Sequence, residues 1–217
     1  MKRIFAIMAA CLLVFSLTAC GGNSKTEAPS SDEPEAGTTS TPAPESPKPF
    51  EEETAVPAET ATKELVVYFS WSGNTKGVAQ EIANQTGADI FEITPETPYS
   101  DDYDTVVDLA RQEQSDNARP VISGTIENLE DYDVIYVGYP NWWGDMPMIL
   151  YTFFDIYDLS GKTIAPFCTS GGSGLSNTVS EIQSLEPDAA VIEGLHIRDS
   201  SADSPAEAVA GWLQAIE

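Results

Sequence analysis

Short apolar runs alternate with longer amphipathic segments along the chain from Glu64 to Glu217. Strand-length apolar runs occupy 64–70, 88–94, 132–140, 162–170 and 189–197. Each is followed by a segment with apolar residues at helical spacing, at 74–87, 102–116, 146–158, 175–186 and 204–217. Five strand–helix units in series predict a three-layer α/β fold, in which a five-stranded parallel sheet carries helices on both faces. A doubly wound sheet of this kind is expected to have the strand order 2-1-3-4-5.

Pro166 interrupts the fourth apolar run, KTIAPFCTS. Proline has no backbone N–H, so it is poorly tolerated where a strand has neighbours on both sides. We therefore expect a bulge or an unpaired amide at this point of the sheet.

The N-terminus has the pattern of an export signal. Lys2 and Arg3 supply a charged start, and the apolar run that follows is too short to span a membrane comfortably. The run ends in LTAC, Leu17 to Cys20, which resembles the lipobox of bacterial lipoproteins. The resemblance implies a signal peptide over 1–19, lipidation of Cys20 and a chain anchored to the extracytoplasmic side of a bacterial membrane. The alternative is an ordinary signal peptide with a chance cysteine, whose cleavage would release the protein.

Residues 20–63 differ in composition from the rest of the chain. After the lipidated Cys20 they are rich in Pro, Ser, Thr and Glu, and only Phe50 and Val56 could contribute to a core. Such a segment cannot bury enough apolar surface to offset its ordering entropy, so we expect a disordered linker between the lipid and a domain over 64–217. A partner-binding role for its proline-rich part is the alternative.

The formal net charge of the chain is −25. A phosphate backbone requires basic patches, so the charge argues against nucleic acid as a partner. It permits a small ligand or a redox protein that docks through a basic face, and it also fits acidity that serves solubility alone. Beyond Cys11 and Cys20 the sequence has one further cysteine, Cys168, so neither a disulfide nor a zinc site is expected.

Three loops rich in Gly, Ser and Trp follow predicted strands. The first loop, SWSGNT, occupies 70–75; the second, YPNWWGDMP, occupies 139–147; the third, CTSGGSG, occupies 168–174. In a sheet of order 2-1-3-4-5 the first and third strands are neighbours where the winding reverses, and ligands bind there, outside the carboxyl ends of the strands. The three loops are therefore expected to meet at one crevice.

The first loop offers hydroxyl side chains and free amides at a helix start, which suits a phosphate. It lacks the Gly-x4-Gly-Lys-Ser/Thr pattern of a triphosphate loop, and neither it nor the third loop has the Gly-x-Gly-x-x-Gly dinucleotide pattern. A single phosphate is the better match. The alternative is a polar turn before a well-capped helix.

The second and third loops suit a flat ring. Trp142 and Trp143 are costly to expose and could stack on an aromatic ligand, although one or both could instead pack on the domain. Gly171, Gly172 and Gly174 would let backbone amides approach the ligand closely. A phosphate at one end and a planar ring at the other describe a mononucleotide with a large heterocycle, and FMN fits.

These three loops together resemble those of the flavodoxin family, in the short form found in bacterial flavodoxin-like proteins. FSWSGNT is similar to the family's phosphate signature, with slightly shorter spacing before the glycine, and GYPNWWGDMP and PFCTSGGSG resemble its two ring-binding loops. The similarity extends over 64–217. It implies a flavodoxin-like fold and FMN held without a covalent bond by Ser70, Trp71, Ser72, Gly73, Asn74, Thr75, Pro140, Asn141, Trp142, Trp143, Gly144, Thr169, Ser170, Gly171, Gly172 and Ser173.

The resemblance leads to three functional hypotheses. The first is a lipid-anchored, extracytoplasmic FMN protein that carries electrons to or from a redox partner. The second is an FMN oxidoreductase that takes hydride from NAD(P)H and reduces quinones, nitro or azo compounds. The third is a binding module that has lost its flavin. No catalytic residue is assigned: Cys168 and His196 are expected to be structural, and Tyr99 and Tyr103 to pack rather than to cap the ring.

Overall fold

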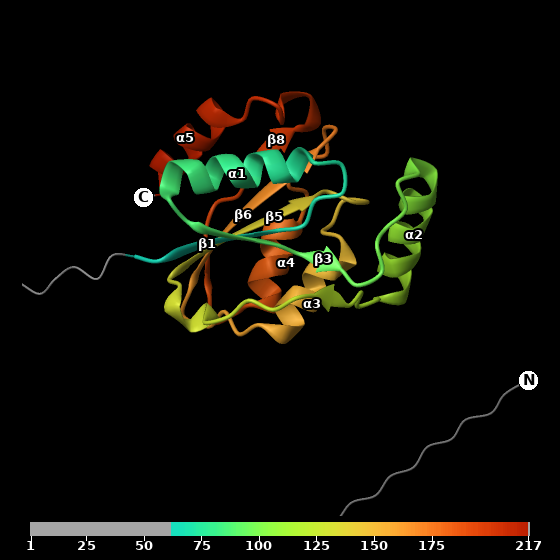
Figure 1. The fold of residues 1–217 in the computed structure, drawn as a ribbon, viewed down its shortest axis with the longest axis horizontal. Coiled ribbons are helices and arrows are strands. Elements are labelled where there is room, and N and C mark those ends of the chain that lie inside the picture. The colour runs from blue at the N-terminus through green and yellow to red at the C-terminus, as the bar shows by residue number, and fades with distance from the viewer. Residues whose placement is uncertain (1–61, 217) are drawn as a thin grey trace, which may run out of the picture. The chain divides into compact units, whose positions relative to one another are not determined.

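The computed structural model describes residues 62–216 (Figure 1). The predicted signal peptide, the lipidation site at Cys20 and nearly all of the predicted linker lie outside these residues and stay predictions. Within 62–216, no helix combines the length and apolar character needed to cross a membrane.

A parallel sheet forms the middle layer, with the order β2-β1-β5-β6-β7. β8 pairs with the carboxyl half of β6, on the same side as β7. The sheet therefore confirms the predicted order 2-1-3-4-5, with two short strands sharing the fifth position. The strands are β1 (Glu64–Tyr68), β2 (Asp89–Glu92), β5 (Val134–Pro140), β6 (Thr163–Ser170), β7 (Ala190–Val191) and β8 (Leu195–Arg198).

Helices cover both faces of the sheet (Figure 1). α1 (Asn74–Thr86) and α5 (Ala206–Ile216) lie on one face, and α3 (Met148–Ile156) and α4 (Thr178–Leu185) lie on the other. β1 is buried on both sides, because Val66 packs in the core under α1 and α5 while Val67 packs in the core under α3 and α4. This burial explains why the strands read as continuous apolar runs rather than as alternating ones.

Several short elements were not predicted. β3 (Thr94–Pro95) and β4 (Ile122–Ser123) form a separate antiparallel pair, and α2 (Tyr103–Asp116) stands between them in sequence. Two 3-10 turns, η1 (Leu129–Asp131) and η2 (Asp199–Ser201), precede β5 and follow β8. In Figure 1 α2 lies to one side of the sheet, beyond the ends of the central strands.

Pro166 leaves its own strand regular. β6 pairs with β5 without a break in register from Thr163 to Thr169, so the expected bulge is absent from this pair. The interruption falls instead in the neighbouring strand: β7 pairs with β6 up to Ile164, and β8 resumes the pairing at Phe167. Ile164 accepts a hydrogen bond from the β7 side, and Pro166, two residues on, faces the same way. The missing N–H therefore faces the gap between β7 and β8.

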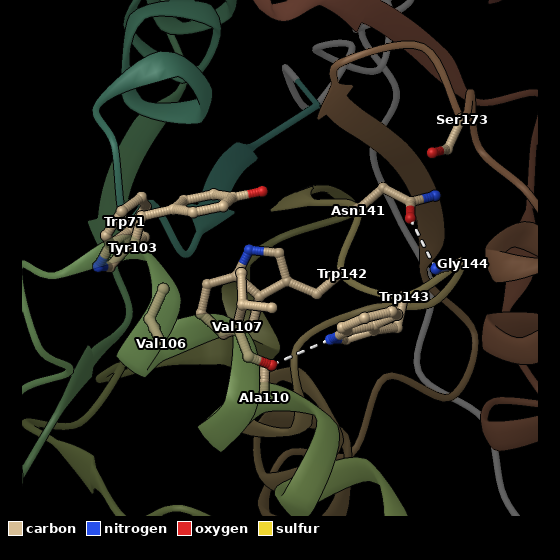
Figure 2. A pocket seen from close by; sticks show the side chains of 10 residues that line it. All are labelled: Trp71, Tyr103, Val106, Val107, Ala110, Asn141, Trp142, Trp143, Gly144 and Ser173. Carbon is tan, nitrogen blue, oxygen red and sulfur yellow. Dashed lines mark hydrogen bonds between the residues drawn. The ribbon is translucent and has the colours of Figure 1, made fainter.

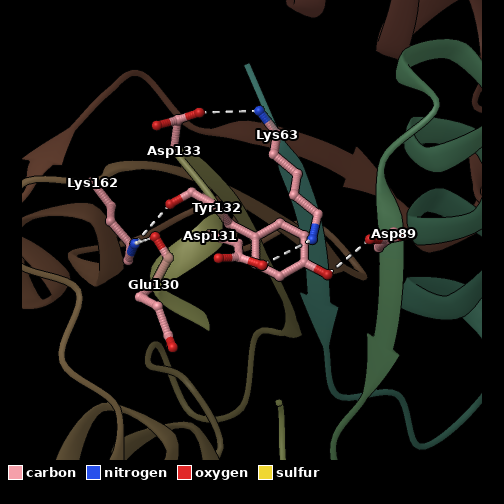
Figure 3. A network of polar contacts seen from close by, with 7 residues as sticks. All are labelled: Lys63, Asp89, Glu130, Asp131, Tyr132, Asp133 and Lys162. Carbon is pink, nitrogen blue, oxygen red and sulfur yellow. Dashed lines mark hydrogen bonds and ion pairs between the residues drawn. The ribbon is translucent and has the colours of Figure 1, made fainter. Parts of the chain in front are cut away.

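The amino end of the sheet is fastened by polar contacts around Lys63 (Figure 3). The Lys63 amide donates to Asp133 (3.0 Å), and its ammonium lies 4.2 Å from the centre of the Tyr132 ring. The Tyr132 hydroxyl in turn donates to Asp89 (2.8 Å). These contacts join the segment that enters β1 to the strands on either side, at the end of the sheet opposite the three loops.

Candidate functional site: a pocket at the carboxyl ends of β1, β5 and β6

The first, second and third loops meet as expected. The Thr75 hydroxyl, at the end of the first loop, lies 2.9 Å from the Thr169 hydroxyl of the third. The backbone N–H of Asn141, in the second loop, donates to the carbonyl of Thr169 (2.8 Å). The three segments, far apart in sequence, are thus hydrogen-bonded to one another.

The first loop leaves the start of α1 open. Gly73 precedes the helix with φ +92°, a conformation that favours glycine, and no side chain caps the helix there. The Ser70 hydroxyl accepts from the Gly73 amide (3.2 Å), which fixes the turn, while Ser72 is exposed. First-turn amides without a capping side chain form a ready site for an anion.

Thr75 and Lys76 have other roles in this loop. Thr75 is 1% exposed, and its hydroxyl joins the first loop to the third. Lys76 forms an ion pair with Glu92 on β2 (2.9 Å). The capacity of the loop to hold an anion therefore comes mainly from backbone amides and from the side chains of Ser72 and Asn74.

The two indoles of the second loop differ in their surroundings. Trp142 is partly buried and makes edge contacts with Phe69 and Tyr99, at centroid distances of 5.5 and 5.4 Å. Trp143 is 51% exposed; its indole N–H donates to the carbonyl of Val107 in α2 (3.1 Å). One indole therefore packs on the domain, and the other is presented to solvent beside α2.

Asn141 organises the loops through its side chain. Its amide N–H groups donate to Gly174 O (2.9 Å) and to Ser176 Oγ (3.0 Å), and its carbonyl accepts from the Gly144 amide (3.0 Å). Asn141 was predicted to line a ring. The structure shows that its polar atoms connect the second loop to the third, so it holds the walls of the site in place.

Ser170 plays the same part within the third loop. Its hydroxyl accepts from the amides of Gly172 and Gly174 (both 3.2 Å) and lies 2.9 Å from His196 Nε2. Cys168 is 1% exposed, and burial raises the pKa of its thiol to about 12. The expectation that Cys168 is a buried core thiol is confirmed. Residues 171–173 themselves are exposed.

A pocket of about 310 Å³ opens between these loops and α2 (Figure 2). Trp71 of the first loop lines one side of the pocket, and mainly apolar side chains of α2 line the other. The lining residues are Trp71, Tyr103, Val106, Val107, Ala110, Asn141, Trp142, Trp143, Gly144 and Ser173.

The contribution of α2 to the pocket was missed from the sequence. Tyr103, Val106, Val107 and Ala110 have the spacing of one helical face, which predicts an amphipathic helix but not a pocket wall. Tyr103 was expected to pack, but it is 65% exposed and lies 6.1 Å from the ring of Trp71. Tyr99 does pack as expected, against Phe69 and Trp142.

A tyrosine–carboxylate pair involves α2, the helix that lines one side of the pocket. The Tyr99 hydroxyl donates to Glu113 of α2 (3.0 Å). Burial raises the pKa of the Glu113 carboxyl, although the hydrogen bond from Tyr99 opposes the shift. Burial, with the negative charge of Glu113, likewise raises the pKa of Tyr99. This pair joins α2 to the segment that follows β2.

Comparison with known proteins identifies the class. Residues 63–216 match the flavodoxin family, and the chain belongs to this family. Flavoproteins of known structure from Bacteroides eggerthii and Bacteroides uniformis are 34% and 33% identical to it, with TM-scores of 0.65 and 0.64. The alignments cover 71% and 70% of this chain and 98% of each relative.

A third similar structure is a flavoprotein from Lactobacillus acidophilus in complex with FMN. It is 29% identical, with a TM-score of 0.57 and coverage of 66% of this chain and 97% of the relative. Comparison with curated proteins gives no match. Because the matched part accounts for nearly the whole of each solved relative, residues 62–217 are suited to study as a domain on their own.

Proposed function

We propose that this protein binds FMN in the pocket between the three loops and α2 and uses it for electron transfer. One observation carries the proposal: a helix start without a capping side chain lies beside an aromatic pocket, and hydrogen bonds between loops hold the two together. The relative from Lactobacillus acidophilus holds FMN on the same fold.

The residues present fit the two ends of this cofactor. The amides that start α1, with Ser72 and Asn74, would hold the phosphate. The volume of the pocket and its indoles suit one flat ring system, with Trp143 available for stacking. When bound, FMN supplies one- and two-electron redox chemistry, and the protein sets its access and potential. The chain's charge of −25 disfavours further negative charge on a bound group and so favours a low reduction potential.

We further propose that the protein works as a carrier at the extracytoplasmic face of a membrane. The sequence LTAC supports lipidation of Cys20, and the acidic domain would attract a partner with a basic face. Both points rest on the sequence.

A second candidate is an NAD(P)H-dependent FMN oxidoreductase, which two cations favour. Arg111 lies 4.9 Å from the ring of Trp143, and Arg198 lies beside Gly172 in the third loop. They could contact the phosphates of a dinucleotide. Steady-state oxidation of NADPH by the FMN-loaded domain would support this candidate. Electron exchange with protein or dye acceptors, with no oxidation of NADPH, would support the electron carrier.

Competition between FMN and riboflavin tests the cofactor proposal. We expect the domain to bind FMN more tightly than riboflavin, because only FMN carries the phosphate. A Ser72→Ala, Asn74→Ala double variant should lose about tenfold or more of this preference, since hydrogen bonds to charged groups contribute roughly 1.5–3 kcal/mol. Titration followed by flavin fluorescence measures both affinities.

Trp143→Ala is the matched control for the ring. It should weaken FMN and riboflavin by similar factors and leave their ratio unchanged. Equal affinity of the wild-type domain for the two ligands would contradict the phosphate assignment. Absence of any binding would favour a module that has lost its flavin.

A further inference from the structure

We propose that His196 is a positioning residue for the third loop: in its neutral form it accepts a hydrogen bond from Ser170, and protonation releases the loop. The consequence for FMN affinity rests on the function proposed above. The state of His196 itself can be measured without FMN.

The argument begins with the hydrogen bonds of Ser170. A serine hydroxyl has one proton to donate and two lone pairs that accept. Both lone pairs are engaged, because the amides of Gly172 and Gly174 each donate to Ser170 Oγ at 3.2 Å. The remaining neighbour is His196 Nε2 at 2.9 Å. The hydroxyl proton is therefore directed at the imidazole.

This arrangement assigns the tautomer of His196. Nε2 must present a lone pair to the hydroxyl, so the proton of the neutral ring is on Nδ1. A protonated imidazole carries N–H groups at both nitrogens and can no longer accept. Its Nε2–H would compete with the two glycine amides for the lone pairs of Ser170, and one of these three donors would lose its partner.

The backbone amides of Gly172 and Gly174 belong to the part of the third loop that borders solvent. Gly172 and Gly174 have φ values of +151° and +68°, and the hydroxyl of Ser170 holds both of their amides. Ser173, which lies between them, borders the pocket. Loss of either amide contact would therefore alter the wall against which the FMN ring is proposed to lie.

Groups of both positive and negative charge lie on the elements around His196. Its side chain lies on the face of the sheet covered by α4, because the adjacent Ile197 packs on the other face among α1 and α5. Titratable or charged groups on the neighbouring elements are Cys168 of β6, Glu181 of α4, Arg198 of β8 and Asp199 of η2. A His196→Gln substitution leaves all of these in place, and its side-chain carbonyl can still accept from Ser170 without titrating.

The first test uses the domain without FMN. His196 is the only histidine in the chain, so its ring ¹⁵N signals are assigned without ambiguity. We expect the Nδ1–H tautomer at about pH 8, above the range in which histidine ordinarily titrates. The amide signals of Gly172 and Gly174 should then shift with the imidazole titration, and they should not do so in His196→Gln. An Nε2–H tautomer, or glycine amide signals that do not shift during the imidazole titration, would overturn the proposal.

The second test measures FMN affinity above and below the midpoint of the imidazole titration that the NMR experiment gives. The wild-type domain should lose about three- to tenfold more affinity on acidification than His196→Gln, the range expected for one or two hydrogen bonds. Protonation of the FMN phosphate affects both proteins alike. The role of His196 is therefore tested only by the difference in pH dependence between the wild-type domain and His196→Gln. Equal pH dependence in the two proteins contradicts the positioning role. Failure to bind FMN at either pH contradicts the proposed function instead, because the NMR experiment does not use FMN.

Discussion

Gly138 shows how one residue can decide the packing of two strands. It lies in β5, and the ring of Phe167 in the adjacent β6 occupies the space where a side chain would begin. Phe167 is among the largest fully buried side chains of the core. The sequence shows a glycine in a strand but cannot show that its missing Cβ makes room for a ring on the next strand.

Gly138→Ala is therefore expected to destabilise the domain. The added methyl group would meet the Phe167 ring, and overpacking of this kind typically costs about 1–3 kcal/mol. Urea unfolding of the domain measures the change. The control is Gly211→Ala in the exposed part of α5, where nothing lies within 4 Å.

Alanine is the better helix former by about 1 kcal/mol, so the control should be neutral or stabilising. A Gly138→Ala variant as stable as the wild type would show that Phe167 can move aside without loss.

Sequence reasoning predicted that the three loops meet, and they do, but it could not assign the hydrogen-bond partners of each polar side chain. Asn141, Ser170 and Thr75 were grouped with residues expected to hold the ligand. Their polar atoms are hydrogen-bonded to other loops or within their own loop. Such partners depend on how the loops fold over one another, which the identity of an Asn, Ser or Thr does not reveal.

At the level of elements, α2 is a helix that lies to one side of the main sheet (Figure 1). It contacts the rest of the domain through individual side chains, including Trp143 and the Tyr99–Glu113 pair. Because α2 forms one wall of the pocket, the stability of these contacts bears directly on access to the site.

Glu113→Gln should stabilise the domain at about pH 8, well above the ordinary titration of glutamate at about 4.3. Burial raises the pKa of Glu113, so folding favours its neutral form. The stability that this carboxyl contributes is present below its ordinary pKa and is lost as the pH rises through its raised pKa. Glutamine cannot ionise, and its carbonyl can still accept from Tyr99.

The free energy of unfolding at about pH 8 and about pH 4, on either side of the titration, measures this effect. The advantage of the variant should shrink toward zero at the lower pH. Glu127→Gln, at an exposed position, is the control for the loss of one negative charge. An advantage equal to that of the control at both values would show that burial of Glu113 has no energetic effect.

The five strand–helix units could be predicted because each is long enough to show periodicity. β3 and β4 could not, because two-residue strands carry no repeat. The position of α2 could not be predicted either: its apolar stripe indicates a covered face but does not distinguish a core from a pocket. The effect of Pro166 was placed in the correct region but in the wrong strand.

For the whole molecule, the proposed lipid attachment makes a simple prediction. In bacteria fed a labelled fatty acid, the full chain should incorporate label, and Cys20→Ala should not, because the acceptor thiol is gone. Cys11→Ala removes a thiol from the predicted signal instead and should still be labelled. Incorporation by Cys20→Ala would contradict the lipobox assignment and leave an ordinary signal peptide as the better interpretation.

The split between β7 and β8 also affects how such molecules behave when they are crowded together. A sheet edge with a long row of free N–H and C=O groups invites strands of other chains to add to it. Here one edge consists of two short strands separated opposite Pro166, and the other is the four-residue β2, with Asp89 and Glu92 at its ends. Neither edge offers a long uncharged template. Because the pairing is interrupted opposite Pro166, we expect this edge to resist the addition of strands from other chains.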